Sequence, residues 1–291
     1  MAPMKSGFCA ILGRANVGKS TFLNRVLAKK LCAVSDKPQT TRHRILGILT
    51  DENSQIVFVD TPGVIKPYYK LQKVMIKTAF SSLAGADVVM VMVEPYIIEE
   101  ELIYKIKDIP VIVVINKIDL LKKRDSLYSL VGRYEEIQDI TKICPISALT
   151  GEGINTLLDE IRSLLSEGEP FYPEDMLSDR DERFFCSEII REKLFKTCGK
   201  EIPYTAAVVI DEFIEREKGK TYIKAIIYVD KESAKSIIIG KSGEKLKKIG
   251  GLARAEIEYF IAKPVYLDLW VKVRKGWRKN INDIREFGYT S

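Results

Sequence analysis

A glycine-rich stretch near the start of the chain carries the residue types that bind phosphate groups. The apolar run Phe8–Leu12 leads into Gly13, a second glycine follows at Gly18, and a helix-like pattern comes next. Glycines let backbone N–H groups curl around phosphate oxygens, and the helix N-terminus adds unpaired N–H groups and partial positive charge. Lys19 adds a full charge for the β- and γ-phosphates, and the Ser20 hydroxyl is placed to hold Mg²⁺. We therefore predict a nucleoside triphosphate site with phosphate-binding residues Gly13, Asn16, Val17, Gly18, Lys19, Ser20 and Thr21.

Two further motifs supply groups that suit a magnesium ion and the terminal phosphate. Asp60 ends an apolar run, where its carboxylate can reach Mg²⁺ through water, and the N–H of Gly63 can lie against the γ-phosphate. The polar loop 37–44 contains Thr41, whose hydroxyl can join the ion and order the loop only while the triphosphate is intact; Thr40 is the alternative. The predicted Mg²⁺ ligands are Ser20, Thr41 and Asp60, and the predicted catalytic residues are Lys19, Thr41, Asp60 and Gly63.

The stretch 116–119, Asn-Lys-Ile-Asp, follows another apolar run and predicts which base is bound. Asp119 can accept two hydrogen bonds from the N1–H and exocyclic amine of guanine, whereas adenine has an acceptor at N1 and no such amine. A buried mismatch of this kind costs about 1–3 kcal/mol or more, so the carboxylate selects guanine. The N–H of Ala148, at the end of a later predicted strand, can donate to the guanine O6. The predicted guanine-binding residues are Asn116, Lys117, Asp119, Ser147 and Ala148.

The second half of the chain contains a basic G-x-x-G turn at residues 240–243. A second phosphate loop is excluded, because the earlier glycine that it needs would fall at Lys235. The alternative is the turn of a KH module, in which two helix ends grip the nucleic-acid backbone and an apolar groove takes about four unpaired nucleotides. Trp277 either stacks on a base or packs within the tail. The predicted RNA-binding residues are Ile239, Gly240, Lys241, Ser242, Gly243, Lys245, Lys248, Lys272 and Arg274.

The elements that must position these motifs fall into two groups. Residues 8–165 alternate apolar strands with amphipathic helices, which is typical of an α/β domain with a mainly parallel sheet. An acidic stretch with two prolines follows and predicts a linker. The rest predicts an α+β unit in the order α-β-β-α-α-β, with a helix over 184–195, strands over 204–213, 221–229 and 265–273, and a helix ending near 261. The predicted boundaries are 1–168 for the first domain, 169–182 for the linker and 183–291 for the second domain.

Composition restricts the class of protein. The formal net charge of +6 permits a nucleic-acid or anionic-membrane partner without requiring one. The five cysteines are scattered and never form a C-x-x-C pair, so we expect free thiols, and the single histidine, His43, argues against zinc sites and catalytic triads. No apolar run is long enough to span a bilayer and no signal peptide is recognisable, so the expected location is the cytoplasm.

The motifs, taken in this order, resemble a translation-factor-class GTPase. The local forms Gly-Arg-x-Asn-Val-Gly-Lys-Ser and Pro-Gln-Thr-Thr-Arg-His-Arg are similar to the Era family, and the resemblance extends through both halves, with Ala15 standing where most relatives carry proline. It implies a bacterial P-loop GTPase domain, using GTP, GDP and Mg²⁺, joined to a KH domain that binds single-stranded ribosomal RNA near the 3′ end of the small-subunit RNA. The implied role is small-subunit maturation in partnership with that subunit, with no DNA partner and with peripheral contact at the inner membrane left open.

Two residues bear on the rate of hydrolysis. Val64 stands where Ras-like enzymes place the glutamine that orients the attacking water, so we expect slow intrinsic turnover. Asn16 matches an asparagine that helps to hold K⁺ beside the phosphates in related GTPases; alternatively it only stabilises the loop. Two other functions stay open: a constitutive RNA-binding scaffold with structural nucleotide, which Val64 favours, and a relative that regulates transfer-RNA modification or a membrane process.

Overall fold

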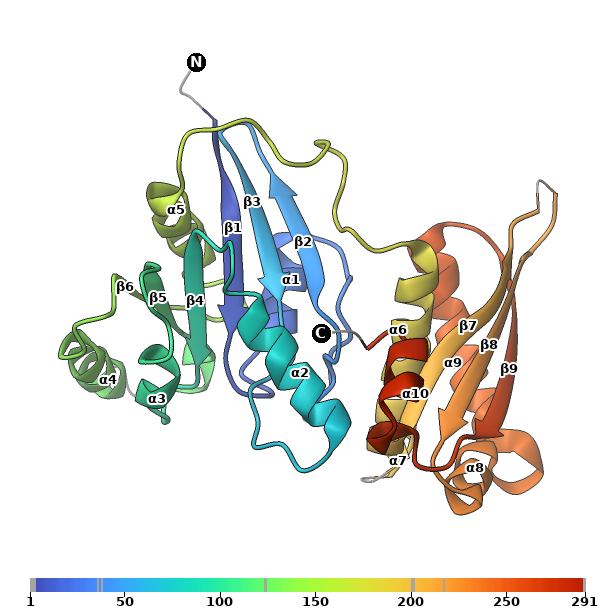
Figure 1. Ribbon diagram of the computed structural model, residues 1–291. Coiled ribbons are helices and arrows are strands. Elements are labelled where there is room, and N and C mark those ends of the chain that lie inside the picture. The colour runs from blue at the N-terminus through green and yellow to red at the C-terminus, as the bar shows by residue number, and fades with distance from the viewer. Residues whose placement is uncertain are drawn as a thin grey trace.

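Two separate β-sheets organise the chain (Figure 1). The computed structural model describes residues 4–35, 37, 39–122, 125–199, 202–216 and 218–289. Within these residues the first sheet has six strands in the order β2-β3-β1-β4-β5-β6, and the second has three in the order β7-β8-β9. The predicted fold class, a mainly parallel α/β domain followed by an α+β domain, is confirmed.

The N-terminal unit alternates strands and helices along the chain. Its strands are β1 (Lys5–Leu12), β2 (Ile45–Thr50), β3 (Ser54–Asp60), β4 (Val88–Val93), β5 (Val111–Ile115) and β6 (Lys142–Pro145). Its helices are α1 (Lys19–Val26), α2 (Lys70–Ser81), α3 (Glu100–Ile103), α4 (Asp125–Glu135) and α5 (Ile154–Leu164), with a 3₁₀ turn η1 (Ile118–Leu120). All neighbouring strands pair in parallel except β2, which runs antiparallel to β3 at one edge.

Helices cover both faces of this sheet, which explains why its central strands are apolar throughout. On one face, α1 and α5 pack against alternate residues of β1, β3 and β4, with Phe22 and Leu157 fully buried. On the other face, α2, α3 and α4 pack against the intervening residues, with Ala79 and Tyr134 fully buried. The carboxyl ends of β1, β3 and β5 therefore meet at one edge, and the predicted nucleotide motifs follow those strands.

The predicted linker is bound to the N-terminal unit along the edge strand β2. The N–H of Ile48 donates to Leu177 O over 2.9 Å, and Ser178 Oγ donates to Leu46 O over 2.6 Å. Tyr172 and Met176 pack on the apolar side chains of β2 and β3. The linker thus covers part of the sheet that the helices leave uncovered, and Figure 1 shows it running from this sheet across to α6.

The C-terminal unit contains the predicted elements and three further short ones, the helices α7 and α10 and the turn η3. Its elements are α6 (Glu182–Thr197), α7 (Ile202–Thr205), β7 (Ala206–Ile214), β8 (Thr221–Val229), α8 (Glu232–Ile239), η2 (Lys241–Gly243), α9 (Glu244–Ile261), β9 (Val265–Val273), η3 (Trp277–Lys279) and α10 (Ile281–Glu286). Strand β8 pairs antiparallel with β7 and parallel with β9. Helices α6, α8 and α9 pack on one face of this sheet.

Three details of the prediction need correction or refinement. The strand predicted from Tyr204 begins at Ala206, because Tyr204 lies in the short helix α7, whose first turn accommodates Pro203. Helix α6 begins at Glu182, inside the predicted linker, because the Asp181 carboxylate accepts from Phe184 N and caps it. The short helices α7 and α10 and the turn η3 had no clear sequence signal. The domain boundaries at 168/169 and 182/183 stay predictions.

The two units share an apolar cluster, which we call the C-terminal cluster. It joins α2 of the first unit to the second sheet and the C-terminal segment, so that α10 lies between the sheet and α2 (Figure 1). Its buried members are Leu71, Met75, Ala207, Trp277, Ile284, Phe287 and Tyr289. Trp277 is fully buried and its Nε1 donates to Thr205 O over 2.8 Å. The alternative that Trp277 stacks on a base is therefore wrong, and it packs the tail against the rest of the molecule.

Candidate nucleotide pocket and nucleic-acid groove

The glycine-rich turn between β1 and α1 has a backbone that side chains would obstruct. Gly13 has φ of 151°, and a Cβ there would lie 2.4 Å from Met92 O. Gly18 has φ of 102°, and its Cβ would lie 2.1 Å from the Asn116 side-chain nitrogen. Both positions need glycine because they combine a left-handed backbone with close approach of other strands. The turn therefore curls tightly over the carboxyl ends of β1 and β4.

Lys19 lies inside this turn. Its Nζ donates to Gly13 O over 3.0 Å and to Arg14 O over 2.9 Å, and the residue is only 6% exposed. Burial lowers the pKa of Lys19 to about 8, and the nearby Asp60 carboxylate acts in the opposite direction. Phosphate oxygens in the turn would favour the charged ammonium, so the lysine is placed to bind a polyanion.

The three predicted Mg²⁺ ligands come together. Thr41 Oγ1 lies 2.8 Å from Ser20 Oγ, which donates to Asp60 Oδ2 over 3.1 Å. Burial raises the pKa of Asp60, and the charge of Lys19 opposes that rise. Two hydroxyls and a carboxylate are the hard oxygen donors that Mg²⁺ prefers, so this set fits the ion. Thr40 Oγ1 instead donates to Lys37 O over 2.8 Å, which favours Thr41 over Thr40 as the ligand.

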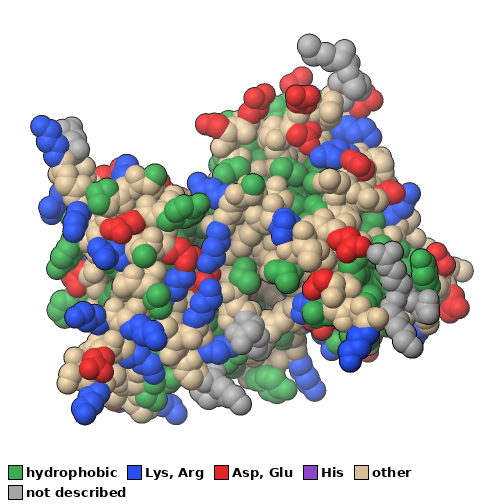
Figure 2. All heavy atoms as spheres, turned by 180° about the vertical axis from the view of Figure 1, so that it is seen from behind, with side chains coloured by type: hydrophobic (Ala, Val, Ile, Leu, Met, Phe, Trp, Pro, Cys, Tyr) green, Lys and Arg blue, Asp and Glu red, His purple; other side chains and the backbone are tan. Residues whose placement is uncertain are grey.

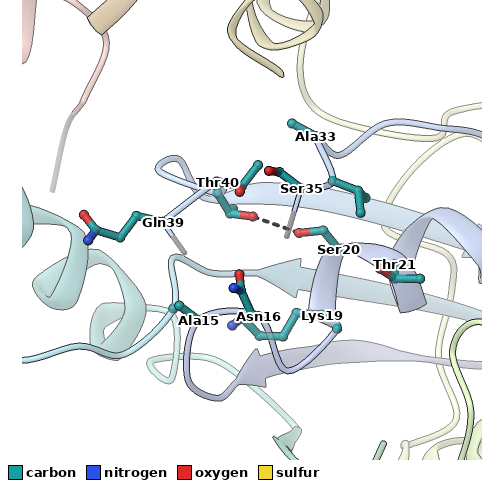
Figure 3. Close-up of a pocket in the computed structure, with 13 residues that line it drawn as sticks. Ala15, Asn16, Lys19, Ser20, Thr21, Ala33, Ser35, Gln39 and Thr40 are labelled. Carbon is teal, nitrogen blue, oxygen red and sulfur yellow. Dashed lines mark hydrogen bonds between the residues drawn. The ribbon is translucent and has the colours of Figure 1, made fainter. Parts of the chain in front are cut away.

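Figure 3 shows the cavity that these groups enclose, with Asn16 and Lys19 on the turn and Ser35, Gln39 and Thr40 on the loop across from them. The cavity holds about 80 Å³, well below the roughly 300 Å³ of a typical ligand pocket. None of the predicted guanine-binding residues lines it, so this cavity corresponds to the phosphate part of the candidate site. Five lining residues were not predicted from the sequence: Ala15, Ala33, Val34, Ser35 and Gln39. Of the predicted phosphate-binding residues, Gly13 and Val17 do not line the cavity and instead shape the turn.

The loop after β3 lies against the phosphate-binding turn. A Cβ on Gly63 would lie 2.7 Å from Ala15 Cα, so only glycine allows this approach. The N–H of Val64 donates to Gly13 O over 3.0 Å. The loop that was predicted to contact the γ-phosphate is thus next to the place where that phosphate must bind, and Val64 offers no polar side chain there.

The predicted guanine-binding residues are connected through Asn116. Its Nδ2 donates to Val17 O over 2.7 Å, and its Oδ1 accepts from Ala148 N over 2.8 Å. The Asp119 carboxylate is exposed and accepts from Ser147 Oγ over 2.6 Å. The Ala148 N–H therefore binds Asn116 in this structure and is not directed at a base, whereas Asp119 has acceptor capacity left for one.

Two residues that support the site, Glu94 and Arg25, were not predicted from the sequence. Lys117 has a left-handed backbone with φ of 66° and forms an ion pair with Glu94. Arg25 Nε on α1 donates to Ala148 O over 2.9 Å, which ties the phosphate-side helix to the base-side loop. Neither Glu94 nor Arg25 has a motif of its own, because each acts only through a partner distant in sequence.

The G-x-x-G turn joins α8 to α9 in the C-terminal unit. Gly240 and Gly243 have φ of 73° and 80°, and Gly243 is the N-cap of α9. A groove of about 440 Å³ runs from this turn between α9 and β9. It has an apolar floor and a basic rim, formed by Gly243, Leu246, Lys247, Gly250, Gly251, Arg254, Leu267 and Leu269. Figure 2 shows Lys and Arg side chains gathered over the C-terminal unit, on the left of that view.

The predicted RNA-binding residues divide into two groups. Those from Ile239 to Lys248 lie at or beside the turn, and Lys241, Ser242 and Lys248 are exposed. Lys272 is exposed on the face of β9 opposite to Leu267 and Leu269, so the structure does not bring it to the groove. Arg274 forms ion pairs of 2.5 Å with Asp283 and 2.8 Å with Glu286 and supports the tail.

Two other features are absent from the part of the chain that the structure describes. Over the parts of the chain that the structure describes, no helix has the length and apolarity to cross a membrane. Over the same parts, His, Cys, Asp and Glu side chains form no group of three or more that could hold a metal. The magnesium site is consistent with this result, because its donors are two hydroxyls and a single carboxylate.

Comparisons with known proteins cover both units. Residues 8–117 match the family model described as 50S ribosome-binding GTPase, and residues 201–278 match the KH domain model. Among solved structures, the chain is similar to Era in complex with MgGDPNP and nucleotides 1506–1542 of 16S ribosomal RNA, at 42% identity and a TM-score of 0.95, over 99% of this chain and 100% of that one. A variant of Era from Aquifex aeolicus bound to GDP and AlF₄⁻ matches with the same identity, coverage and TM-score.

Proposed function

The chain belongs to the Era family of GTPases, and from this premise we propose that it is a GTP-dependent switch that binds single-stranded small-subunit ribosomal RNA near its 3′ end and acts in biogenesis of that subunit. The enzyme activity is hydrolysis of GTP to GDP and phosphate, with Mg²⁺ as cofactor. The proposal concerns the RNA, the switch and the residues that carry each role.

One observation carries the proposal: a single chain holds both a guanine-nucleotide pocket and a G-x-x-G groove with a basic rim. The RNA class follows from the relative that covers the whole chain, which was solved with 16S RNA. The family model named after the 50S subunit matches only residues 8–117, which exclude the groove. The groove is the part that would contact RNA, so we favour the small subunit.

Each side chain in the pocket has a role that its position supports. Lys19 would neutralise the β- and γ-phosphates, and Asp119 would accept from the guanine edge. Ser20, Thr41 and Asp60 would hold Mg²⁺, which supplies positive charge opposite the phosphates. The Gly63 N–H would bind the γ-phosphate, while Val64 cannot orient water, so slow intrinsic turnover stays a prediction. Asn16 would hold K⁺ beside the phosphates, which faster hydrolysis in KCl than in NaCl would support.

The test is RNA affinity in two nucleotide states. A short single-stranded RNA that copies the small-subunit 3′ end is titrated with the full chain loaded with GDP or with GDPNP at fixed salt. We expect tighter binding with GDPNP. Gly243→Asp should abolish binding, because it places a negative charge at the clamp where a Cβ meets no other atom within 4 Å. Gly85→Asp is the matched control, since that glycine of the first domain has nearly the same φ, 82°, and also has open space around it.

Equal affinity in both nucleotide states would favour the scaffold alternative, because a ligand that does not distinguish two states cannot shift them. RNA binding that survives Gly243→Asp would contradict the groove assignment. A cytoplasmic location and peripheral contact with the inner membrane belong to the same proposal, with the basic face of the KH domain as the surface that would meet anionic lipid.

A further inference from the structure

The loop that carries Thr41 is attached to the KH domain by a cation on each side of the threonine. Lys37 Nζ donates to Cys198 O over 2.8 Å and also to Phe195 O. Arg42 Nη1 donates to Ala206 O and Nη2 to Pro203 O, both over 2.8 Å. All four acceptors are backbone carbonyls from the end of α6 to the start of β7.

These contacts use groups that need partners. The last carbonyls of a helix have no intrahelical donor and sit at the negative end of the helix dipole, so a lysine ammonium is favoured there. The planar guanidinium of Arg42 matches two carbonyls at once, and the residue is only 3% exposed. Truncating Arg42 would leave buried carbonyls without donors. The contacts are therefore specific rather than incidental surface pairs.

Neither cation lines the nucleotide cavity. Thr41, the residue next to Arg42, has its Oγ1 2.8 Å from Ser20 Oγ in the magnesium cluster. Consecutive Cα atoms are about 3.8 Å apart, so fixing Arg42 restricts where Thr41 can lie. On the other side, Thr40 Oγ1 donates to Lys37 O and closes the loop. The anchored positions thus bracket the threonine that joins the pocket.

A second set of contacts continues from the same part of the KH domain towards the G-x-x-G turn. Lys30 Nζ pairs with Glu192 on α6 over 2.8 Å and with Glu256 on α9 over 2.5 Å. Lys193 on α6 also pairs with Glu256. Helix α9 begins at the G-x-x-G turn, so α6 touches both the Thr41 loop and the helix that would grip RNA.

We propose that Lys37 and Arg42 are positioning residues for GTP hydrolysis, which hold Thr41 at the magnesium cluster by binding carbonyls of the KH domain. This inference rests on the proposed function, because it takes Thr41 as a ligand of the ion. The KH domain is then part of the hydrolytic machinery. A ligand that moves α6 and α9 would therefore shift Thr41 relative to the magnesium cluster and change the affinity for nucleotide. By linkage, nucleotide then changes the affinity for that ligand by the same factor.

The test compares Lys37→Ala and Arg42→Ala with the wild type as full-length proteins. We expect kcat for GTP to fall about 10-fold or more and half-saturation by Mg²⁺ to move to higher concentration, since small displacements of positioning groups cost this much. Affinity for GDP, which lacks the phosphate that Thr41 would face, should change less than about 2-fold. Truncation of a residue that only supports the fold would weaken the binding of Mg²⁺ and of GDP together.

Controls separate this inference from the function on which it rests. Arg44→Ala removes an exposed cation from the same loop and should hydrolyse GTP as the wild type does. Thr41→Ala should lose activity if Thr41 serves the ion at all. If Thr41→Ala is impaired while both Lys37→Ala and Arg42→Ala keep wild-type kcat and Mg²⁺ dependence, the inference is overturned and the proposed function stands. If Arg42→Ala does not fold, the half-buried Lys37 decides by the same measurements.

Discussion

Asn116 connects two loops of the candidate nucleotide site, because its amide binds both Val17 O and Ala148 N. Asp119, three residues later, is exposed and shares only Ser147 with the protein. The division of work is clear at this scale: the buried amide shapes the pocket, and the exposed carboxylate is left to meet the base. Substitutions at the two positions should therefore have different consequences.

Asp119→Asn should change base preference with little effect on the fold. An amide cannot accept from both the N1–H and the exocyclic amine of guanine, so GDP affinity should fall about 100-fold or more. The same amide can donate to the extra carbonyl of xanthine, so XDP should bind better than it does to the wild type. Competition against a fluorescent nucleotide measures both. The control is Asp139→Asn, which changes an exposed carboxylate away from the pocket. If Asp119→Asn kept the wild-type preference for guanine, the assignment would be refuted.

At the residue scale the sequence could predict the groups with a chemistry of their own. Lys19 and Asp60 were predicted because each belongs to a recognisable motif at the end of a strand, and Thr41 because it lies in a polar loop that can order around the triphosphate. Arg25 and Gln39 were not, because nothing in their identity or spacing connects them with phosphate. Gln39 lines the pocket and Arg25 supports it only through tertiary contacts, which no short motif records.

Helix α6 is the element whose composition is hardest to explain locally. Ten of its 16 residues are buried, and they include the charged Glu188 and Arg191. They form an ion pair on one face, with Arg191 Nε 2.8 Å from Glu188 Oε1. Their proximity lowers the pKa of Glu188 and raises that of Arg191, in both cases against the effect of burial. Such a pair is tolerated only while both partners are present.

Glu188→Ala should destabilise the protein by about 3–5 kcal/mol, because it leaves Arg191 charged and unpaired in the interior. Urea unfolding measures this change. Glu182→Ala, in the exposed first turn of the same helix, should cost less than about 1 kcal/mol. The double variant Glu188→Met with Arg191→Leu should recover much of the loss. A midpoint for Glu188→Ala equal to that of the wild type would show that the pair is not needed.

The sequence predicted the C-terminal end of α9 and both ends of β9 as observed, because the apolar periodicity and the flanking turns agree there. It did not predict α7 or α10. Both are short helices that form against other parts of the chain, and helices of that length have no stable local preference in water.

The arrangement of the two units depends on contacts that cross from one to the other. His43 stacks on Tyr289 with ring centroids 4.5 Å apart and meets Phe184 edge to face. Burial lowers the pKa of His43 to about 4; Glu188 opposes this shift, and Arg191, Arg180 and Arg42 add to it. The neutral imidazole therefore belongs to the assembled state.

Acidification should weaken this assembly. The unfolded chain binds a proton at His43 near its ordinary pKa of about 6.5, whereas the folded chain does so only near pH 4. The unfolded state binds more protons in between, so this contribution to stability is complete above about pH 6.5 and is lost as the pH falls towards 4. The free energy of unfolding, measured with urea from pH 7.5 to 5, should decline more steeply for the wild type than for His43→Phe, which keeps the ring stack. Parallel declines would contradict the prediction.

Trp277→Ala should separate the two units during unfolding. The side chain is fully buried in the C-terminal cluster, and truncation of such a residue costs about 3–5 kcal/mol. The cluster joins α2 to the KH sheet, so the loss should fall on the interface, and calorimetry should resolve two transitions. Trp270→Ala, which removes a half-exposed tryptophan from β9, should keep the wild-type profile. A single transition lowered as a whole for Trp277→Ala would argue against a separable interface.

At this scale the sequence predicted two units and a linker between them and could not predict how they meet. The sequence of the linker is polar and contains proline, yet the linker binds β2 through the Leu177 carbonyl, which accepts from Ile48 N, and the Ser178 hydroxyl, which donates to Leu46 O. Those contacts depend on which edge of the first sheet is left open, and that is a property of the completed sheet rather than of any stretch of sequence.

The same contact has a consequence for synthesis on the ribosome. Strand β2 is an edge strand, and an uncovered edge invites pairing with other chains. The segment that covers it, residues 172–178, is made after every strand and helix of the first unit. A nascent chain therefore carries a bare strand edge after its first hydrophobic core is complete, and the edge closes only as α6 begins to emerge. Pausing of translation before residue 180 would prolong the interval in which this protein is most prone to aggregate.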